Sequence, residues 1–98
     1  MNDERARDAR IERLEVEALG GDRWRVRVAG RTTHEVTAAP AALRRAAALE
    51  GEAADETLRR TFDFLLEREP AESILTRFSL EDVARYFPDF WSVMSATR

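Results

Sequence analysis

Residues 14–37, LEVEALGGDRWRVRVAGRTTHEVT, decide the fold of this chain, because apolar and polar side chains alternate along them. The alternation falls into three segments, and turns that contain Gly20-Gly21 and Gly30 separate them. A period of two residues places every second side chain on the same face of a β-strand. The stretch therefore predicts an antiparallel meander with one apolar face, whose strands span about 11–19, 23–29 and 33–38.

The same alternation restricts how the strands pair. A three-residue loop at Gly20–Asp22 keeps the apolar faces together, whereas a two-residue loop would set a glutamate opposite Trp24. The expected pairs of the first two strands are Leu14–Val28, Val16–Val26 and Ala18–Trp24. A loop of the same length at Gly30–Thr32 would then pair Val26 with Val36, and Val28 with His34.

Three arginines on the polar face of the middle strand raise the question of nucleic acid binding. Arg23, Arg25 and Arg27 could follow a phosphate backbone, but the expected pairing sets Glu15 and Glu35 beside Arg27. The whole chain carries a net charge of −3, and its acidic excess falls in residues 63–98. Nucleic acid is therefore an unlikely partner. An accessory protein that binds it, through these arginines or a helix-turn-helix-like C-terminus, is kept as the first alternative.

After residue 38 the two-residue period is lost, and the pattern predicts helices. Pro40 suits a first helical turn, Pro70 and Pro88 break helices, and Ser79 with Asp82 resembles a capping box. Apolar side chains recur at helical spacing between these positions. The expected helices span about 40–50, 54–68, 71–78, 80–87 and 88–96.

Length and composition fit a single α+β domain. The 98 residues are 44% hydrophobic, which is enough for one core. We expect a three-stranded meander, followed by helices that pack on it, over residues 11–98, with residues 1–10 as a flexible charged lead-in. The chain has no cysteine, no apolar run that could span a bilayer and no signal-peptide pattern, which favours a cytoplasmic protein. Its arginine- and alanine-rich, lysine-free composition favours a bacterial source.

No motif for catalysis, a cofactor or a metal is recognisable. His34 is the only histidine, and a zinc site needs three or four ligands. The serines lie where caps and turns are expected, and none has a base motif beside it. We therefore predict a non-catalytic protein without a cofactor. A small-molecule binder or enzyme whose site is not visible in the sequence is the second alternative.

Two clusters are candidates for contact with another protein or with a second copy of the chain. The first is aromatic, and adjacent aromatic residues on a helix point in different directions, so one of each pair can stay at the surface. Its members are Tyr86, Phe87, Phe90 and Trp91. The second and weaker cluster surrounds the bend at Pro70, and its members are Glu67, Arg68, Glu69 and Glu72. The structural alternative is a small core beneath short helices for the first cluster and stabilisation of the bend for the second.

Two stretches of the second half resemble a group of small, uncharacterised bacterial proteins: FDFLLEREPAESIL at 62–75 and FSLEDVARYFPDF at 78–90. In that group an N-terminal strand region leads into a FLLEREPxxSIL helix and turn, and then into an FxL…YFP segment. Thr33–Val36 also looks similar, so the resemblance covers most of residues 24–91. It implies the same order of strands and helices and brings no activity, cofactor or catalytic residue with it.

Overall fold

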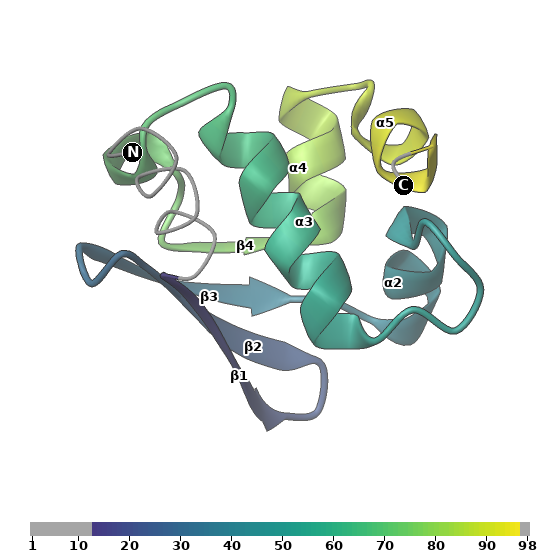
Figure 1. Ribbon diagram of the computed structural model, residues 1–98, viewed down its shortest axis with the longest axis horizontal. Helices are drawn as coiled ribbons and strands as arrows, with labels where there is room; N and C mark the ends of the chain where they lie inside the picture. The colour runs from purple at the N-terminus through teal and green to yellow at the C-terminus, as the bar shows by residue number, and fades with distance from the viewer. Residues whose placement is uncertain (1–12, 97–98) are drawn as a thin grey trace, which may run out of the picture.

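The computed structural model describes residues 13–96, and its sheet begins with the predicted meander (Figure 1). Strands β1 (Leu14–Gly20), β2 (Arg23–Val28) and β3 (Thr32–Thr37) pair in antiparallel fashion. A short fourth strand, β4 (Arg77–Ser79), runs parallel to β3 and completes the order β1-β2-β3-β4. The α+β class and the meander are confirmed, with one strand more than predicted. The expected lead-in and the start of the first predicted strand lie outside the described residues.

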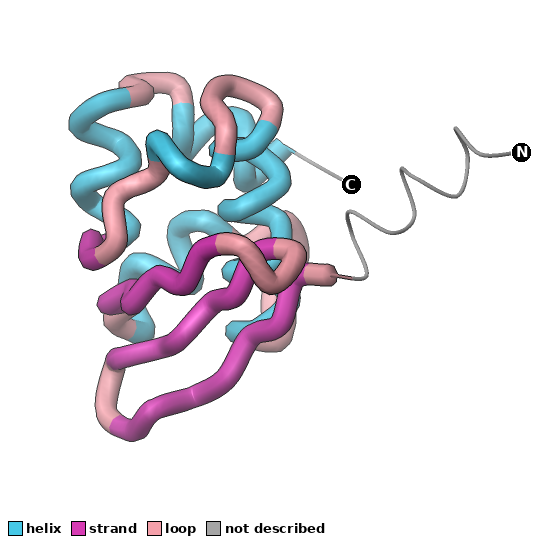
Figure 2. Tube along the Cα trace, turned by 90° about the vertical axis from the view of Figure 1, so that its left-hand side faces the viewer, coloured by secondary structure: helices cyan, strands magenta, loops and turns pink. Residues whose placement is uncertain are grey.

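The remaining elements within residues 13–96 are helical. They are α2 (Pro40–Ala46), α3 (Ala54–Leu66), a 3-10 turn η1 (Ala71–Ser73), α4 (Leu80–Tyr86) and α5 (Phe90–Ala96). Helix α2 is shorter than predicted, because the chain turns extended at Ala47, where ψ is 140°. A loop that includes Gly51, at a φ of +84°, then leads into α3. The helices lie on one side of the sheet in both views (Figure 1, Figure 2).

The predicted helix over residues 71–78 is wrong. Only Ala71–Ser73 turn as a 3-10 helix, and Ile74 is already extended, with φ −73° and ψ 135°. The backbone N–H of Glu35 in β3 donates to the carbonyl of Thr76 at 2.8 Å and carries the chain into β4. Ile74 and Phe78 are both buried, as a helix would also have them. A separation of four residues places two side chains on one face of a helix and of a strand alike, so it does not distinguish them.

The register of the first two strands follows the prediction, and that of β2 with β3 does not. Leu14 pairs with Val28 and Ala18 with Trp24, as expected. In the second hairpin, by contrast, Val26 lies opposite His34 instead of Val36.

The second turn closes one residue earlier than predicted. Ala29 and Gly30 both have positive φ angles, of 54° and 69°, and the N–H of Arg31 donates to the carbonyl of Val28 at 2.9 Å. A positive φ is uncommon for alanine, so a prediction that located the turn by its glycine alone placed it one residue too late. The pairing thereby shifts by two residues, which keeps every side chain on its predicted face.

Helix α3 forms the centre of the core, as its apolar spacing predicted. Leu58 and Phe62 are fully buried over the sheet, where they join Val26 and Val36 from β2 and β3. The opposite face of the sheet carries the arginines and glutamates of the strands. Helix α2 packs mainly against α5, beside the sheet, and not on it. The fold thus brings several elements together at the C-terminal end of α3, where a surface site can form.

Candidate protein-docking groove

An open groove of about 210 Å³ lies between the end of α3, the segment after Pro70, and α4. Its floor is apolar, and the four floor side chains are only 3–5% exposed. They are Leu65, Ile74, Phe78 and Val83. The ring of Phe78 lies 5.9 Å from that of Phe62, so the floor is continuous with the main core. We call this feature the α3–α4 groove.

Two large apolar side chains at the edge of the α3–α4 groove are exposed to solvent. Leu75 is 49% exposed and Tyr86 is 67% exposed, and both line the groove. Within the described residues only Leu49 is a comparably exposed large apolar side chain. Exposed apolar side chains that gather around a depression are typical of interaction surfaces. The groove therefore has the character of a protein contact site.

A buried histidine fixes the position of Leu75. His34 is 1% exposed, and its Nδ1 lies 2.7 Å from the carbonyl oxygen of Leu75. Because a carbonyl only accepts, Nδ1 donates, and in the neutral ring Nε2 accepts from the Thr32 hydroxyl at 2.9 Å. The His34 ring also packs against Phe62, with centroids 5.4 Å apart. His34 thus attaches one edge of the groove to the sheet.

A capping box fixes the opposite wall, at the start of α4. The Ser79 hydroxyl accepts from the N–H of Asp82 at 3.2 Å, and the Asp82 carboxylate accepts from the N–H of Ser79 at 3.0 Å. The capping box predicted from the sequence is therefore confirmed. Asp82 also forms an ion pair with Arg85 at 3.3 Å. The carboxylate of Asp82 lines the groove, but these contacts already occupy it.

Glu69 is the second carboxylate that lines the groove, and its situation differs. The residue is partly buried, and within residues 13–96 its carboxylate takes part in no ion pair or hydrogen bond. Its backbone N–H donates to the carbonyl of Leu65 at 2.9 Å, which places it directly after the last turn of α3. The groove therefore combines an apolar floor with one unpaired negative charge.

The structure divides the predicted aromatic cluster into two parts. Tyr86 and Phe87 line the α3–α4 groove. Phe90 is fully buried, with its ring 5.2 Å from that of Phe64, so its assignment to a contact surface is corrected to a core residue. Trp91 is partly buried, and the guanidinium of Arg45 in α2 lies 4.5 Å from its ring. Phe90 and Trp91 belong to the packing of α5, away from the groove.

The charged cluster at the Pro70 bend also separates. Arg68 stacks on Phe64, 3.6 Å from guanidinium carbon to ring centroid, and forms ion pairs with Glu67 at 3.8 Å and Asp89 at 3.5 Å. It therefore joins the end of α3 to the turn before α5. Glu72 pairs with Arg31 at 3.3 Å, across to the second hairpin. Of the four predicted residues, only Glu69 faces the groove.

Sequence reasoning missed Ile74 and Leu75 as groove residues. Both fall within the helix predicted over residues 71–78, which does not form, and in the extended segment Ile74 is buried whereas Leu75 is exposed. The signal that could have identified the segment is the pair of threonine and arginine residues, Thr76-Arg77, between two apolar positions. Two polar residues between apolar ones are too short a signal to predict a strand without its neighbour β3.

The three arginines of β2 are each paired with a glutamate. Arg23 lies 3.2 Å from Glu35, Arg25 lies 2.9 Å from Glu17, and Arg27 lies 3.9 Å from Glu15. Glu35 was expected to pair with Arg27. The two-residue shift instead sets Glu35 opposite Arg25, and its carboxylate reaches diagonally to Arg23. The outer face of the sheet is thus a lattice of opposite charges.

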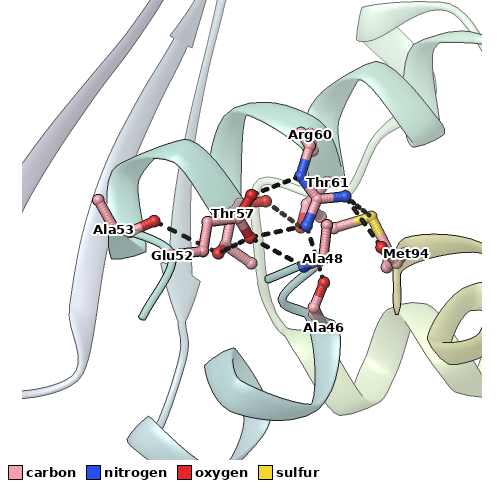
Figure 3. A network of polar contacts seen from close by, with 8 residues as sticks. All are labelled: Ala46, Ala48, Glu52, Ala53, Thr57, Arg60, Thr61 and Met94. Carbon is pink, nitrogen blue, oxygen red and sulfur yellow. Dashed lines mark hydrogen bonds and ion pairs between the residues drawn. The ribbon is translucent and has the colours of Figure 1, made fainter. Parts of the chain in front are cut away.

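A second polar cluster, away from the groove, was not predicted (Figure 3). Arg60 donates to both carboxylate oxygens of Glu52, at 2.9 and 2.7 Å, and to the carbonyls of Ala46 and Met94, at 2.9 and 3.0 Å. Glu52 also accepts from the hydroxyl of Thr57 at 2.6 Å. No spacing rule for a helix or strand links residues 52 and 60. We call this group the Arg60 cluster.

The Arg60 cluster is largely removed from solvent. The side chains of Arg60 and Glu52 are 14% and 11% exposed. The hydrogen bond from Arg60 lowers the pKa of Glu52 most strongly, the bond from Thr57 adds to the lowering, and burial opposes it. Because the protein itself satisfies these groups, the cluster joins α2, α3 and α5 and offers no free group for chemistry.

Other kinds of site find little support in the described part of the chain. Among residues 13–96 no three histidine, aspartate or glutamate side chains are placed to hold a metal ion. None of the helices there has the length and apolar character needed to cross a membrane. Comparisons with protein-family models, curated proteins and solved structures found no match. The resemblance to a group of small bacterial proteins therefore stays a prediction.

Proposed function

We propose that this protein is a small non-catalytic docking protein of the cytoplasm, which binds another protein in the α3–α4 groove. The observation that carries the proposal is the exposure of Leu75 and Tyr86 at the edge of an apolar floor. Removing apolar surface from water contributes roughly 25 cal/mol per Å². A partner that covers both side chains therefore gains free energy from a surface that is already formed.

The size of the groove supports a protein partner more than a small molecule. Its volume of about 210 Å³ is smaller than the roughly 300–1,000 Å³ of typical ligand pockets. It can accept a few side chains that project from a second protein. Its carboxylates, Glu69 and Asp82, are not hydrogen-bonded to a nucleophilic side chain or a histidine within residues 13–96, so the groove lacks the pairing that acid–base or nucleophilic catalysis needs.

Charge supports a protein partner over nucleic acid and over a second copy. The arginines of β2 are occupied by glutamates, so they do not present a free track for phosphates. The groove itself carries Glu69 and Asp82, and two copies that met groove to groove would bring these carboxylates together. Like charges at a contact disfavour it. We therefore propose a partner different from this chain.

Photo-crosslinking in the native host tests the proposal. A photo-reactive amino acid at position 86 should give a discrete adduct, whereas the same group at position 33, on the outer face of the sheet, should not. A second substitution, Leu75→Ala, should weaken the adduct because it removes the exposed edge of the groove. Equal crosslinking at both positions, or none at position 86, would show that the groove is not the contact site.

A further inference from the structure

We infer that the partner presents a basic amphipathic helix to the α3–α4 groove, and that Glu69 selects it. The helix would place apolar side chains on the groove floor and one arginine or lysine against the carboxylate of Glu69. This inference rests on the proposed docking function and adds the chemistry of the partner. Four features of the structure support it.

The first feature is that Glu69 differs from the other carboxylates nearby. Glu67, Glu72, Asp82 and Asp89 all take part in ion pairs with arginines. Glu69 forms no ion pair with any residue of 13–96, although it is partly buried at the groove. A charge that loses part of its hydration without a partner is costly, and a cation brought by another protein offsets that cost. Coulomb attraction is also stronger there than between fully exposed groups.

The second feature is that the arginines of the surrounding elements are occupied. Arg31 pairs with Glu72, Arg85 pairs with Asp82, and Arg68 is stacked on Phe64 and paired with Asp89. Arg77 follows the groove segment, but it lines a different hollow, together with Arg25 and Glu35 on the sheet. Residues 13–96 therefore supply no cation to Glu69, and a partner can bring the complementary charge.

The third feature is the state of the backbone along the groove. The carbonyl of Leu75 accepts from His34, the carbonyl of Thr76 accepts from the N–H of Glu35, and the N–H of Ile74 donates to Ala71. These bonds occupy several of the backbone groups that β-strand addition would need. Recognition through side chains, as when an amphipathic helix lies in an apolar groove, is therefore favoured.

The fourth feature is the pair of exposed apolar side chains. Leu75 and Tyr86 stand on opposite walls, one on the extended segment and one at the end of α4. A helix presents side chains at i, i+3 and i+4 on one face. Such a face can fill the floor and contact both walls, while a basic residue at its border reaches Glu69.

Two designed peptides test the inference against the intact chain. Each is an alanine-rich helix of about fifteen residues, long enough to be helical in water, with a stripe of leucines on one face. The basic peptide has arginines beside the stripe, and the acidic peptide has glutamates at the same positions. Fluorescence anisotropy at low salt should show that the basic peptide binds at least about tenfold more tightly, and that added salt weakens it.

Substitutions identify the selecting residue. Glu69→Gln should weaken binding of the basic peptide by about threefold to tenfold and should reduce the preference between the peptides. Glu81→Gln is the matched control, because it removes the same charge from an exposed position on α4 that does not line the groove. It should leave binding within about twofold, as expected for an exposed charge that makes no direct contact.

The outcomes separate this inference from the docking function. If both peptides bind equally, or if Glu69→Gln and Glu81→Gln have the same effect, the inference is wrong. In that case, loss of binding in Leu75→Ala would still support the groove as a docking site. If neither peptide binds the wild-type chain, the basic-helix inference fails, and the crosslinking experiment decides the docking function by itself.

Discussion

The Arg60 cluster and the α3–α4 groove lie at different parts of the same helix, and they differ in how completely their polar groups are satisfied. In the Arg60 cluster, the Glu52 carboxylate and the Arg60 guanidinium meet donors and acceptors of the protein on several sides. At the groove, the Glu69 carboxylate has no such partner in the described part of the chain, and apolar side chains are exposed to water. A cluster whose polar groups have partners within the chain stabilises the fold. A surface whose polar and apolar side chains lack such partners is available to another molecule.

The largest effect on stability should come from the buried part of α5, the helix that the Arg60 cluster joins to α3. Phe90→Ala removes a fully buried ring beside Phe64 and should lower the free energy of unfolding by about 3–5 kcal/mol. Its matched control is Tyr86→Ala at the groove, which should change stability by less than about 0.5 kcal/mol, apart from a small change in helix propensity. Urea unfolding followed by tryptophan fluorescence measures both. Equal costs would contradict the division of the aromatic residues into core and surface.

Removal of one member of the Arg60 cluster should have the next largest effect. Arg60→Met leaves the Glu52 carboxylate without its cation and two carbonyl groups without their donor in a mostly buried place, and should cost about 3 kcal/mol. The double variant Arg60→Met, Glu52→Leu should recover part of this loss, because the unpaired charge is then gone. A loss below about 1 kcal/mol for the single variant would mean that the ion pair is solvated like a surface pair.

Acid should weaken the Arg60 cluster. The pKa of Glu52 is lowered in the folded chain, so this residue contributes stability that is fully present above the ordinary value of 4.5. That contribution is lost as pH falls through the lowered pKa. We expect urea midpoints of the wild type to fall more steeply below pH 4.5 than those of Glu52→Gln. Parallel curves for the two proteins would show that Glu52 is not coupled to folding.

The smallest effect on stability is expected at Glu69. Glu69→Gln removes a charge that has no partner among residues 13–96, so the free energy of unfolding should change by less than about 0.5 kcal/mol. Glu52→Gln serves as the comparison, since it removes a charge with several partners and should cost more. A large loss of stability in Glu69→Gln would show that this carboxylate has a structural partner after all.

The sequence allows prediction of those features that depend on periodicity and on local capping. The meander, the first hairpin register, helix α3 and the Ser79–Asp82 capping box are all of this kind. The second hairpin register is not, because a shift of two residues leaves the apolar face unchanged. Strand β4 is not either, because its three residues form a strand only through pairing with β3.

The candidate site could be predicted in part for the same reason. Three residues that line the groove were identified from their residue type and their place in the sequence: Tyr86, Phe87 and Glu69. Phe90 was a candidate for the surface only as one member of an adjacent aromatic pair, of which one side chain was expected to stay exposed. Which of them is buried depends on the angle at which α5 packs against α3, and this packing angle cannot be predicted from the sequence. Leu75 was missed because its exposure follows from the hydrogen bond between His34 and its carbonyl.

The pairing of β3 with β4 has a consequence for the order in which the molecule assembles. The three strands of the meander join neighbours along the chain, whereas β4 joins residue 35 to residue 77. Long-range pairings form late, because the intervening chain must first be ordered. We therefore expect the wall that holds Ile74 and Leu75 to close last during folding. A partner that binds there would recognise only chains that have finished folding, and would leave those still in progress unbound.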